Sequence, residues 1–152
     1  MPHRFPTGLL LLATLFVWAG LVAGISFLEA PLRFTAPHIT IPLGVGIGRI
    51  VFHALNKVEI GLAAVAGSCV LLQRQPGPAR GGLGLLYAIL ALQTAWLLPA
   101  LDVRAGALLA GHAPPPTHLH LLYIGTDVVK LLTLLVTGWL AGAARRTEAL
   151  GS

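Results

Sequence analysis

Charged residues are scarce in this chain, and cysteine is almost absent. Only 10% of the 152 residues are charged and 56% are apolar, whereas an average soluble domain has about 25% charged residues. A small domain cannot hide so much apolar surface from water, which excludes a soluble globular protein and a disordered chain. The single cysteine, Cys69, excludes a disulfide framework and a zinc module built on thiolates. A polytopic membrane protein is the class that remains.

The basic residues do not form the kind of patch that binds nucleic acid. The net charge is +5, but the ten Lys and Arg residues are scattered between apolar runs. This pattern is typical of charges that orient a membrane protein in the bilayer. We therefore expect the lipid bilayer as the main partner and no nucleic acid.

Four stretches are long and apolar enough to form transmembrane helices, each of which needs about 20 residues. They cover residues 9–28, 47–72, 83–101 and 118–142, and clusters of proline, glycine or charge separate them. The loops are too short to hold another domain. The sequence thus predicts an all-α integral membrane bundle, a single four-helix domain over residues 1–152 with both termini on the same side.

The first span resembles a signal peptide, with a basic start at Arg4 and small residues at Ala23 and Gly24. Its apolar run is longer than the 7–15 residues usual in the core of such a peptide. We therefore expect an anchored first helix.

The distribution of Lys and Arg in the short loops predicts the orientation, because cytoplasmic loops are richer in these residues. If both termini are inside, the inner side holds Arg4, Arg74, Arg80, Arg145 and Arg146, and the outer side holds Arg33, Arg49 and Arg104. The excess on the inner side favours cytoplasmic termini in a multi-pass protein of the plasma (inner) membrane.

Two of the spans carry ionisable side chains deep inside the membrane. The second span holds Arg49, His53, Asn56, Lys57 and Glu59, and the fourth holds His120, Tyr123, Asp127 and Lys130. A charge at the centre of a span costs about 2.5–3.5 kcal/mol on the insertion scale. These spans therefore need polar partners.

Helical rise places the charges of the two spans at matching depths. Lys57 and Asp127 lie roughly 15 and 13 Å from the outer ends of their spans, and Glu59 and Lys130 both lie roughly 18 Å deep. Gln93 of the third span falls near the same layer, roughly 12 Å deep. Spacings of three and four residues also place Arg49, His53 and Asn56 in one stripe of the second span, with Lys57 beside it and Glu59 to one side, and His120, Tyr123, Asp127 and Lys130 in a second stripe on the fourth span. We therefore predict that the two stripes face each other and form the ion pairs Lys57–Asp127 and Glu59–Lys130, within a polar core in the outer half of the bundle.

The predicted core supplies the candidate ligand-binding residues. They are Arg49, His53, Lys57, Glu59, Gln93, His120, Tyr123, Asp127 and Lys130, with Glu29, Asp102 and Arg104 at the mouth. Intramembrane ionisable residues are functional candidates, which favours binding or transport of a small polar ligand or ion. Polar pairs also hold membrane helices together, so the alternative is a structural or accessory subunit that pairs with itself or with a membrane partner protein. A cavity reaching Lys57 and Asp127 would favour the first hypothesis, and a dry, closed pair the second.

Other chemistry finds little support in the sequence. Imidazole binds copper, zinc and haem, so His53, His118 and His120 make a metal or haem carrier the weaker alternative, and we expect no cofactor and no metal site. Residues 44–48 read Gly-Val-Gly-Ile-Gly but lack the strand and the Lys-Ser or Lys-Thr pair of a phosphate-binding loop. These glycines fit close helix packing instead. No hydrolase triad stands out, so the sequence does not predict an enzyme.

Several segments resemble one known family. They are Trp18-Ala19-Gly20, residues 27–31, Arg49-Ile50-Val51-Phe52, residues 97–104 and residues 118–123. In these segments the chain resembles the transmembrane-protein-205-like family, a four-helix membrane domain with many bacterial members. The resemblance implies the same four-helix fold, and it implies no reaction or substrate.

Overall fold

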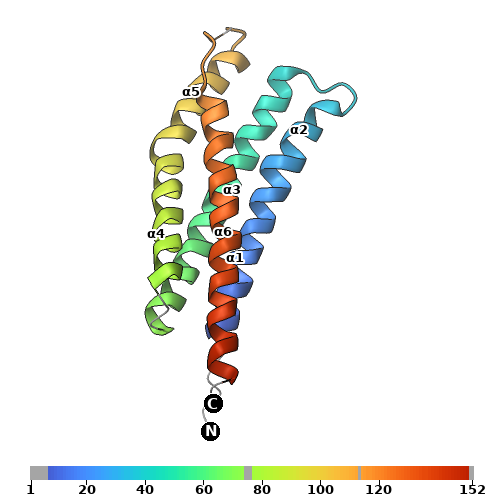
Figure 1. The fold of residues 1–152 in the computed structure, drawn as a ribbon. Helices are drawn as coiled ribbons and strands as arrows, with labels where there is room; N and C mark the ends of the chain where they lie inside the picture. Colours follow the sequence, from blue (N-terminus) through green and yellow to red (C-terminus); the bar gives the residue numbers. More distant parts are fainter. Residues whose placement is uncertain (1–6, 74–76, 113, 151–152) are drawn as a thin grey trace.

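The computed structural model describes residues 7–73, 77–112 and 114–150, which form helices and no strand. Four helical segments are long and apolar enough to cross a membrane. They are Thr7–Thr35, Ile41–Leu72, Ala79–Leu109 and Leu119–Ala144. The predicted all-α bundle of four such helices is confirmed, and Thr7 and Leu150 lie at the same end of it (Figure 1).

The first and third segments are each built from several helical elements. The first comprises α1 (Thr7–Val22), the π-helix η1 (Ala23–Glu29), α2 (Ala30–Leu32) and the 3₁₀-helix η2 (Arg33–Thr35). The second segment is α3 (Ile41–Gln73). The third comprises α4 (Gly77–Leu92), the π-helix η3 (Gln93–Leu97) and α5 (Leu98–Leu109). The fourth is α6 (Leu119–Leu150). We call the end formed by η2, the start of α3, the end of α5 and the start of α6 the loop end (Figure 1).

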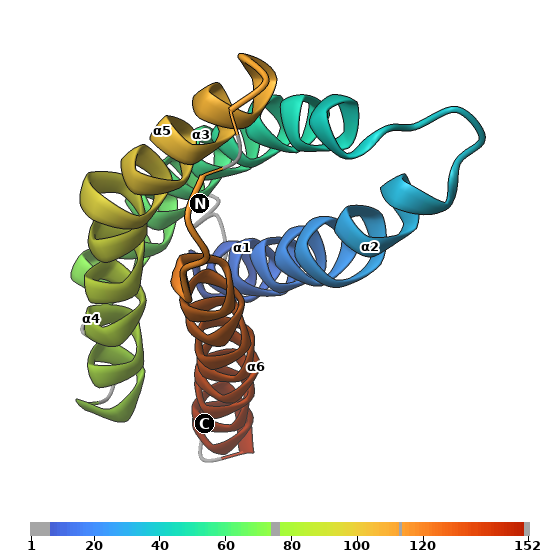
Figure 2. The same cartoon turned by 90° about the horizontal axis from the view of Figure 1, so that it is seen from above.

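The four segments form a ring in which α3 and α6 are diagonal neighbours. α1 packs against both α3 and α6, α4 packs against α6, and α5 packs against α3. Seen from the loop end, the α1–α2 and α4–α5 segments lie on opposite sides of the α3–α6 diagonal (Figure 2). Any direct contact between α3 and α6 must therefore cross the middle of the bundle.

A proline lies two residues after the end of each π-helix, and the helical segment continues beyond the proline in both cases. Pro31 follows η1 and Pro99 follows η3. A proline lacks a backbone N–H and its ring clashes with the carbonyl four residues earlier, so the preceding turn widens. The helices run on beyond residues 28 and 101, where the predicted spans end, to Thr35 and Leu109. The second span likewise begins earlier than residue 47, because Pro42 lies in the first turn of α3, where the missing N–H costs little.

A polar layer separates two apolar clusters inside the bundle. The larger cluster lies toward the terminal end and contains Leu11, Leu15, Ala66, Leu86 and Leu134 among others. The smaller one lies toward the loop end and contains Leu97, Leu98 and Tyr123. Between them along the helices are the buried polar residues Glu59, Gln93, Asp127 and Lys130. The candidate site is built on this layer.

Candidate functional site

The polar layer begins with one face of α6. Tyr123, Asp127, Lys130 and Leu134 are spaced by four, three and four residues, which places them on the same side of a helix. All four are buried in the structure. This face points to the centre of the bundle, as the spacing of the polar residues predicts.

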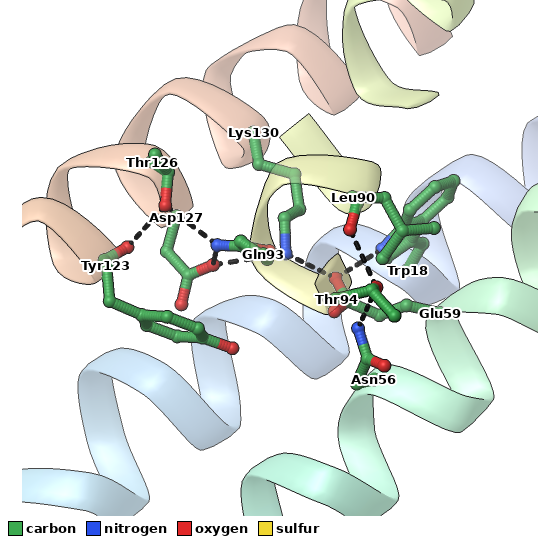
Figure 3. Close-up of polar contacts among 10 residues, drawn as sticks. All are labelled: Trp18, Asn56, Glu59, Leu90, Gln93, Thr94, Tyr123, Thr126, Asp127 and Lys130. Atoms are coloured by element: carbon green, nitrogen blue, oxygen red, sulfur yellow. Dashed lines mark hydrogen bonds and ion pairs between the residues drawn. The ribbon is translucent and has the colours of Figure 1, made fainter. Parts of the chain in front are cut away.

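Lys130 is the centre of the layer. Its Nζ lies 2.7 Å from Glu59 Oε1 and 3.1 Å from Asp127 Oδ1, and both the Lys130 and the Glu59 side chains are 0% exposed. The predicted Glu59–Lys130 pair is therefore confirmed, and it bridges the α3–α6 diagonal (Figure 3).

The other two segments contribute hydrogen bonds to the same carboxylates. Trp18 of α1 donates from Nε1 to Glu59 Oε1 over 2.8 Å. Gln93 of η3 donates from Nε2 to Asp127 Oδ1, also over 2.8 Å, and to the hydroxyl of Thr126 (Figure 3). All four segments thus meet at two carboxylates and one ammonium group.

The predicted Lys57–Asp127 pair is wrong. Asp127 is bound by Lys130 and Gln93, whereas Lys57 is exposed, and none of the ion pairs among the described residues includes it. Successive residues of an α-helix are rotated by about 100°, so two residues place Lys57 and Glu59 on nearly opposite faces. Only one of them can point inward, and it is Glu59.

The stripe of polar residues on α3 faces α5 and η3, not α6 as predicted. Arg49 Nε lies 3.0 Å from Asp102 Oδ1, and His53 Nε2 lies 2.6 Å from Asp102 Oδ2. Asn56 donates from Nδ2 to the hydroxyl of Thr94 over 2.8 Å. Arg49 and His53 therefore hold the third segment against the second, toward the loop end.

Several buried polar atoms of the layer have no hydrogen-bond partner among the described residues. They are Ser26 Oγ, Glu59 Oε2, Gln93 Oε1, Tyr123 OH and Asp127 Oδ2. A buried polar group without a partner costs about 1–3 kcal/mol. Such groups are rare in native proteins and call for a partner such as water or a ligand.

A cavity of about 660 Å³ opens between all four segments on the loop-end side of the layer. Its polar lining residues are Ser26, Arg33, Arg49, Asp102, Arg104, His120, Tyr123 and Asp127, and its aromatic apolar ones are Phe27, Phe34 and Phe52. Three of the unpartnered atoms belong to residues that line it, namely Ser26, Tyr123 and Asp127. The cavity therefore reaches the predicted site at Asp127 but not at Lys57.

Arg33 forms part of the cavity wall, and the space for its side chain depends on glycines near the start of α3. Its Nε donates to Glu29 Oε1 over 2.9 Å, and its Nη1 donates to the Gly44 carbonyl over 3.0 Å. A Cβ at Gly48 would collide with the guanidinium, and one at Gly44 with the Phe34 ring. The two glycines therefore let the side chains of Arg33 and Phe34, at the end of the first segment, lie close to the backbone of α3.

The structure divides the predicted site residues into three groups. Tyr123, Asp127, His120 and Arg49 line the cavity; Glu59, Gln93 and Lys130 lie in the polar layer; His53 and Lys57 lie on the outer flank of α3. At the predicted mouth, Asp102 and Arg104 line the cavity, and Glu29 holds Arg33.

Sequence reasoning missed Ser26, Arg33 and the three phenylalanines. The signal for Ser26 and Phe27 was Pro31, which widens the turn that presents them. Phe34 and Arg33 lie beyond the predicted end of the first span, in a segment that was expected to be a loop.

The histidines do not gather into a metal site in the part of the chain that the structure describes. No group of three His, Cys, Asp or Glu side chains there could hold a metal ion. His53 is engaged with Asp102 on the flank of α3, and His120 lines the cavity. His53 and His120, two of the three histidines of the metal or haem alternative, therefore lie at two separate places.

Comparison of the chain with protein-family models, curated proteins and solved structures gave no match. The resemblance to the transmembrane-protein-205-like family thus stays a prediction.

Proposed function

We propose that this chain is an integral membrane protein that binds a small amphipathic ligand in the cavity at the loop end. The ligand's apolar body lies among the phenylalanine rings, and its polar group donates a hydrogen bond to Asp127. The observation that carries this proposal is Asp127 Oδ2, a buried carboxylate oxygen without a partner among the described residues, on a side chain that lines the cavity.

The atoms at the deep end of the cavity favour a ligand that donates hydrogen bonds. A carboxylate oxygen only accepts, and the Ser26 and Tyr123 hydroxyls each have lone pairs to offer. The layer behind them also has two carboxylates, Glu59 and Asp127, for the single ammonium of Lys130. Three arginines also line the cavity, but each is engaged elsewhere: Arg33 binds Glu29, Arg49 binds Asp102, and Arg104 binds the Pro115 carbonyl. An amine ligand would therefore supply the second positive charge beside Asp127, so amines are the class that fits best.

The walls suit the rest of such a molecule. Phe27, Phe34 and Phe52 line the cavity with aliphatic residues such as Leu98 and Leu101. An apolar body gains from burial there, and an ammonium group near an aromatic face gains a cation–π attraction of about 0.5–2 kcal/mol. Pockets that combine apolar walls with a few convergent polar groups are typical ligand sites.

Binding fits the interior of the bundle better than conduction through it. Beyond the polar layer the interior is filled by the larger apolar cluster, including Leu15, Ala66, Leu86 and Leu134. An ion that reached Asp127 from the loop end would have no polar path onward through this conformation. Transport would require a second conformation that opens the layer to the terminal end.

The Glu59–Lys130 pair supports the site rather than forming it. Neither residue lines the cavity, both side chains are fully buried, and their bonds tie α1, α3 and α6 together. This is the structural role expected of polar pairs between membrane helices. It fixes Lys130, which in turn holds Asp127 at the cavity floor.

We also propose which membrane holds the protein and on which side its termini lie. The basic residues favour the plasma (inner) membrane with cytoplasmic termini, so the loop end and its cavity open on the outer side. A ligand would reach Asp127 from the outer leaflet or the outer water.

A pair of tryptophan substitutions tests this function. Ile124 lines the cavity, whereas Val128, one turn later on α6, is 41% exposed. Molecules released from purified protein are identified by mass spectrometry for wild type, Ile124→Trp and Val128→Trp, after melting curves show that each variant folds. We expect wild type and Val128→Trp to release an amphipathic hydrogen-bond donor that Ile124→Trp lacks. If wild type releases nothing that Ile124→Trp lacks, the proposal is contradicted.

A further inference from the structure

Lys57 presents a charge to the outside of the bundle halfway along α3. It is the central residue of the 33-residue helix α3, and it is exposed. Apolar side chains on this flank are also exposed: Ile50, which lines the same surface groove as Lys57, at 72%, Val58 at 48%, and Val103, which follows Asp102 in the chain, at 76%. Such a surface faces lipid, and a charge on it needs a counter-charge or a route to the interface.

A groove on the same flank supplies that route. The groove has a volume of about 550 Å³ and is lined by Arg49, Ile50, His53, Ala54, Lys57 and Asp102. The three basic residues are spaced by four, so they form one stripe along α3 that rises toward the loop end. Side chains on a helix point toward its N-terminus, which for α3 is the loop end. Lys57 therefore extends its ammonium group toward His53 and Arg49, the direction in which a lysine inside the membrane reaches the interface.

The charges in this groove do not balance. Asp102 is the one carboxylate among its lining residues, and both its oxygens are already engaged by Arg49 and His53. Lys57 belongs to none of the ion pairs among the described residues. An anion that enters from the side would meet Lys57 and Arg49 together, with apolar surface on either side for its hydrocarbon part.

We propose that this groove binds the phosphate of an anionic phospholipid between the ammonium group of Lys57, the principal ligand, and the guanidinium group of Arg49 nearer the loop end, with the acyl chains running from there past Val58 toward the other end of the bundle. The position of the groove selects a lipid over a free anion, because it opens sideways onto the apolar surface. The site is distinct from the cavity of the proposed function, which Lys57 does not line.

The test is lipid binding measured by native mass spectrometry on the protein in detergent. The probes are phosphatidylglycerol, phosphatidylcholine and glycerol phosphate, and the variants are Lys57→Met, Lys57→Arg and Arg80→Met, an exposed arginine of α4 far along the chain from the groove. We expect wild type to bind phosphatidylglycerol at least tenfold more tightly than phosphatidylcholine, and glycerol phosphate not measurably. Lys57→Met should weaken phosphatidylglycerol at least tenfold, whereas Lys57→Arg and Arg80→Met should retain it.

Three results would overturn the proposal. If Lys57→Met binds phosphatidylglycerol as tightly as wild type does, Lys57 is not the group that binds the phosphate. Glycerol phosphate binding as well as the lipid would make the groove an anion site rather than a lipid site. A dimer or a co-purified membrane protein that Lys57→Met abolishes would show that a protein carboxylate fills the groove. Lipid-free melting temperatures of the variants show that each one folds, so a loss of binding reports on the groove.

Discussion

Lys130 on α6 reaches Glu59 on the diagonally opposite helix α3, with 2.7 Å between Nζ and Oε1 and no exposed surface on either side chain. Since α3 and α6 are separated by their neighbours elsewhere, this pair and its hydrogen bond from Trp18 join three helices at one point. A buried pair of this kind is costly to break, because removing one partner leaves the other charge without compensation.

Replacing Lys130 should therefore be far more harmful than replacing Lys57. We expect Lys130→Met to lower the free energy of unfolding by about 3–5 kcal/mol, because it leaves Glu59 and Asp127 buried together without a cation. Lys57→Met removes an exposed lysine from a lipid-facing surface and should cost less than about 1 kcal/mol. Reversible unfolding in mixed micelles gives both values. Equal losses for the two variants would show that Lys57 is also part of the buried layer.

The indole of Trp18 should be worth one charge-assisted hydrogen bond. Trp18→Phe removes the donor to Glu59 Oε1 and should cost about 2–4 kcal/mol, which combines that bond with some lost packing. Trp96 is 50% exposed on η3, so Trp96→Phe is the matched control and should change stability by less than about 0.5 kcal/mol. The same unfolding measurement compares the two variants. If Trp18→Phe loses no more stability than Trp96→Phe, the hydrogen bond from Trp18 to Glu59 does not stabilise the protein.

Two glycines of α4 test its packing against α6. A Cβ at Gly82 would press on the short, branched Thr137 side chain, whose Cβ would lie 3.2 Å away, whereas one at Gly84 would meet nothing within 4 Å. We expect Gly82→Ala to destabilise by about 1–3 kcal/mol through overpacking. Gly84→Ala should stabilise by about 0.5–1 kcal/mol, because alanine favours the helix. Thermal melting of both variants checks the sign of each change, and a stabilising Gly82→Ala would contradict this helix contact.

The orientation can be read from single thiols on a Cys69→Ala background. Thr40 lies exposed at the loop end and Gly81 lies exposed near the other end of the bundle. A membrane-impermeant maleimide added to whole cells should label Thr40→Cys and leave Gly81→Cys unlabelled until the membrane is broken. The reverse pattern would invert the proposed topology and place the cavity on the cytoplasmic side.

The fold, the residues of the polar layer and one of the two predicted ion pairs follow from the sequence, and the reason is geometric. The apolar runs are long enough to define the helices, and residues at matched depth on parallel spans meet if they also face inward, as Glu59 and Lys130 do. Depth alone does not decide the face, so Lys57 was paired wrongly with Asp127. The polar stripe of Arg49, His53 and Asn56, with Lys57 beside it, was expected to face the fourth span, but it faces α5 and η3. Because Lys57 and Glu59 lie on nearly opposite faces of α3, Glu59 is the one that points inward.

The cavity was beyond the reach of sequence patterns. Its existence depends on where helices separate, and that in turn depends on the π-helical turns before Pro31 and Pro99. A proline in an apolar run predicts either an end or a wide turn, and the two outcomes share one sequence signal. The walls formed by Phe27 and Phe34 became part of the site because the first helix continued past Pro31.

The most direct test of the account is the affinity of one amine for the wild-type protein and for Asp127→Asn. The probes are phenylbutylamine, phenylbutanol and phenylbutanoate, which share an apolar body and differ in the polar group, and their binding to purified protein is followed by calorimetry. We expect wild type to bind the amine most tightly and the carboxylate not measurably. Asp127→Asn should weaken the amine about 10- to 100-fold, the worth of a hydrogen bond to a charged group, and should change the alcohol much less. Amine affinity that is unchanged in a folded Asp127→Asn variant would contradict the claim that Asp127 is the ligand-binding group.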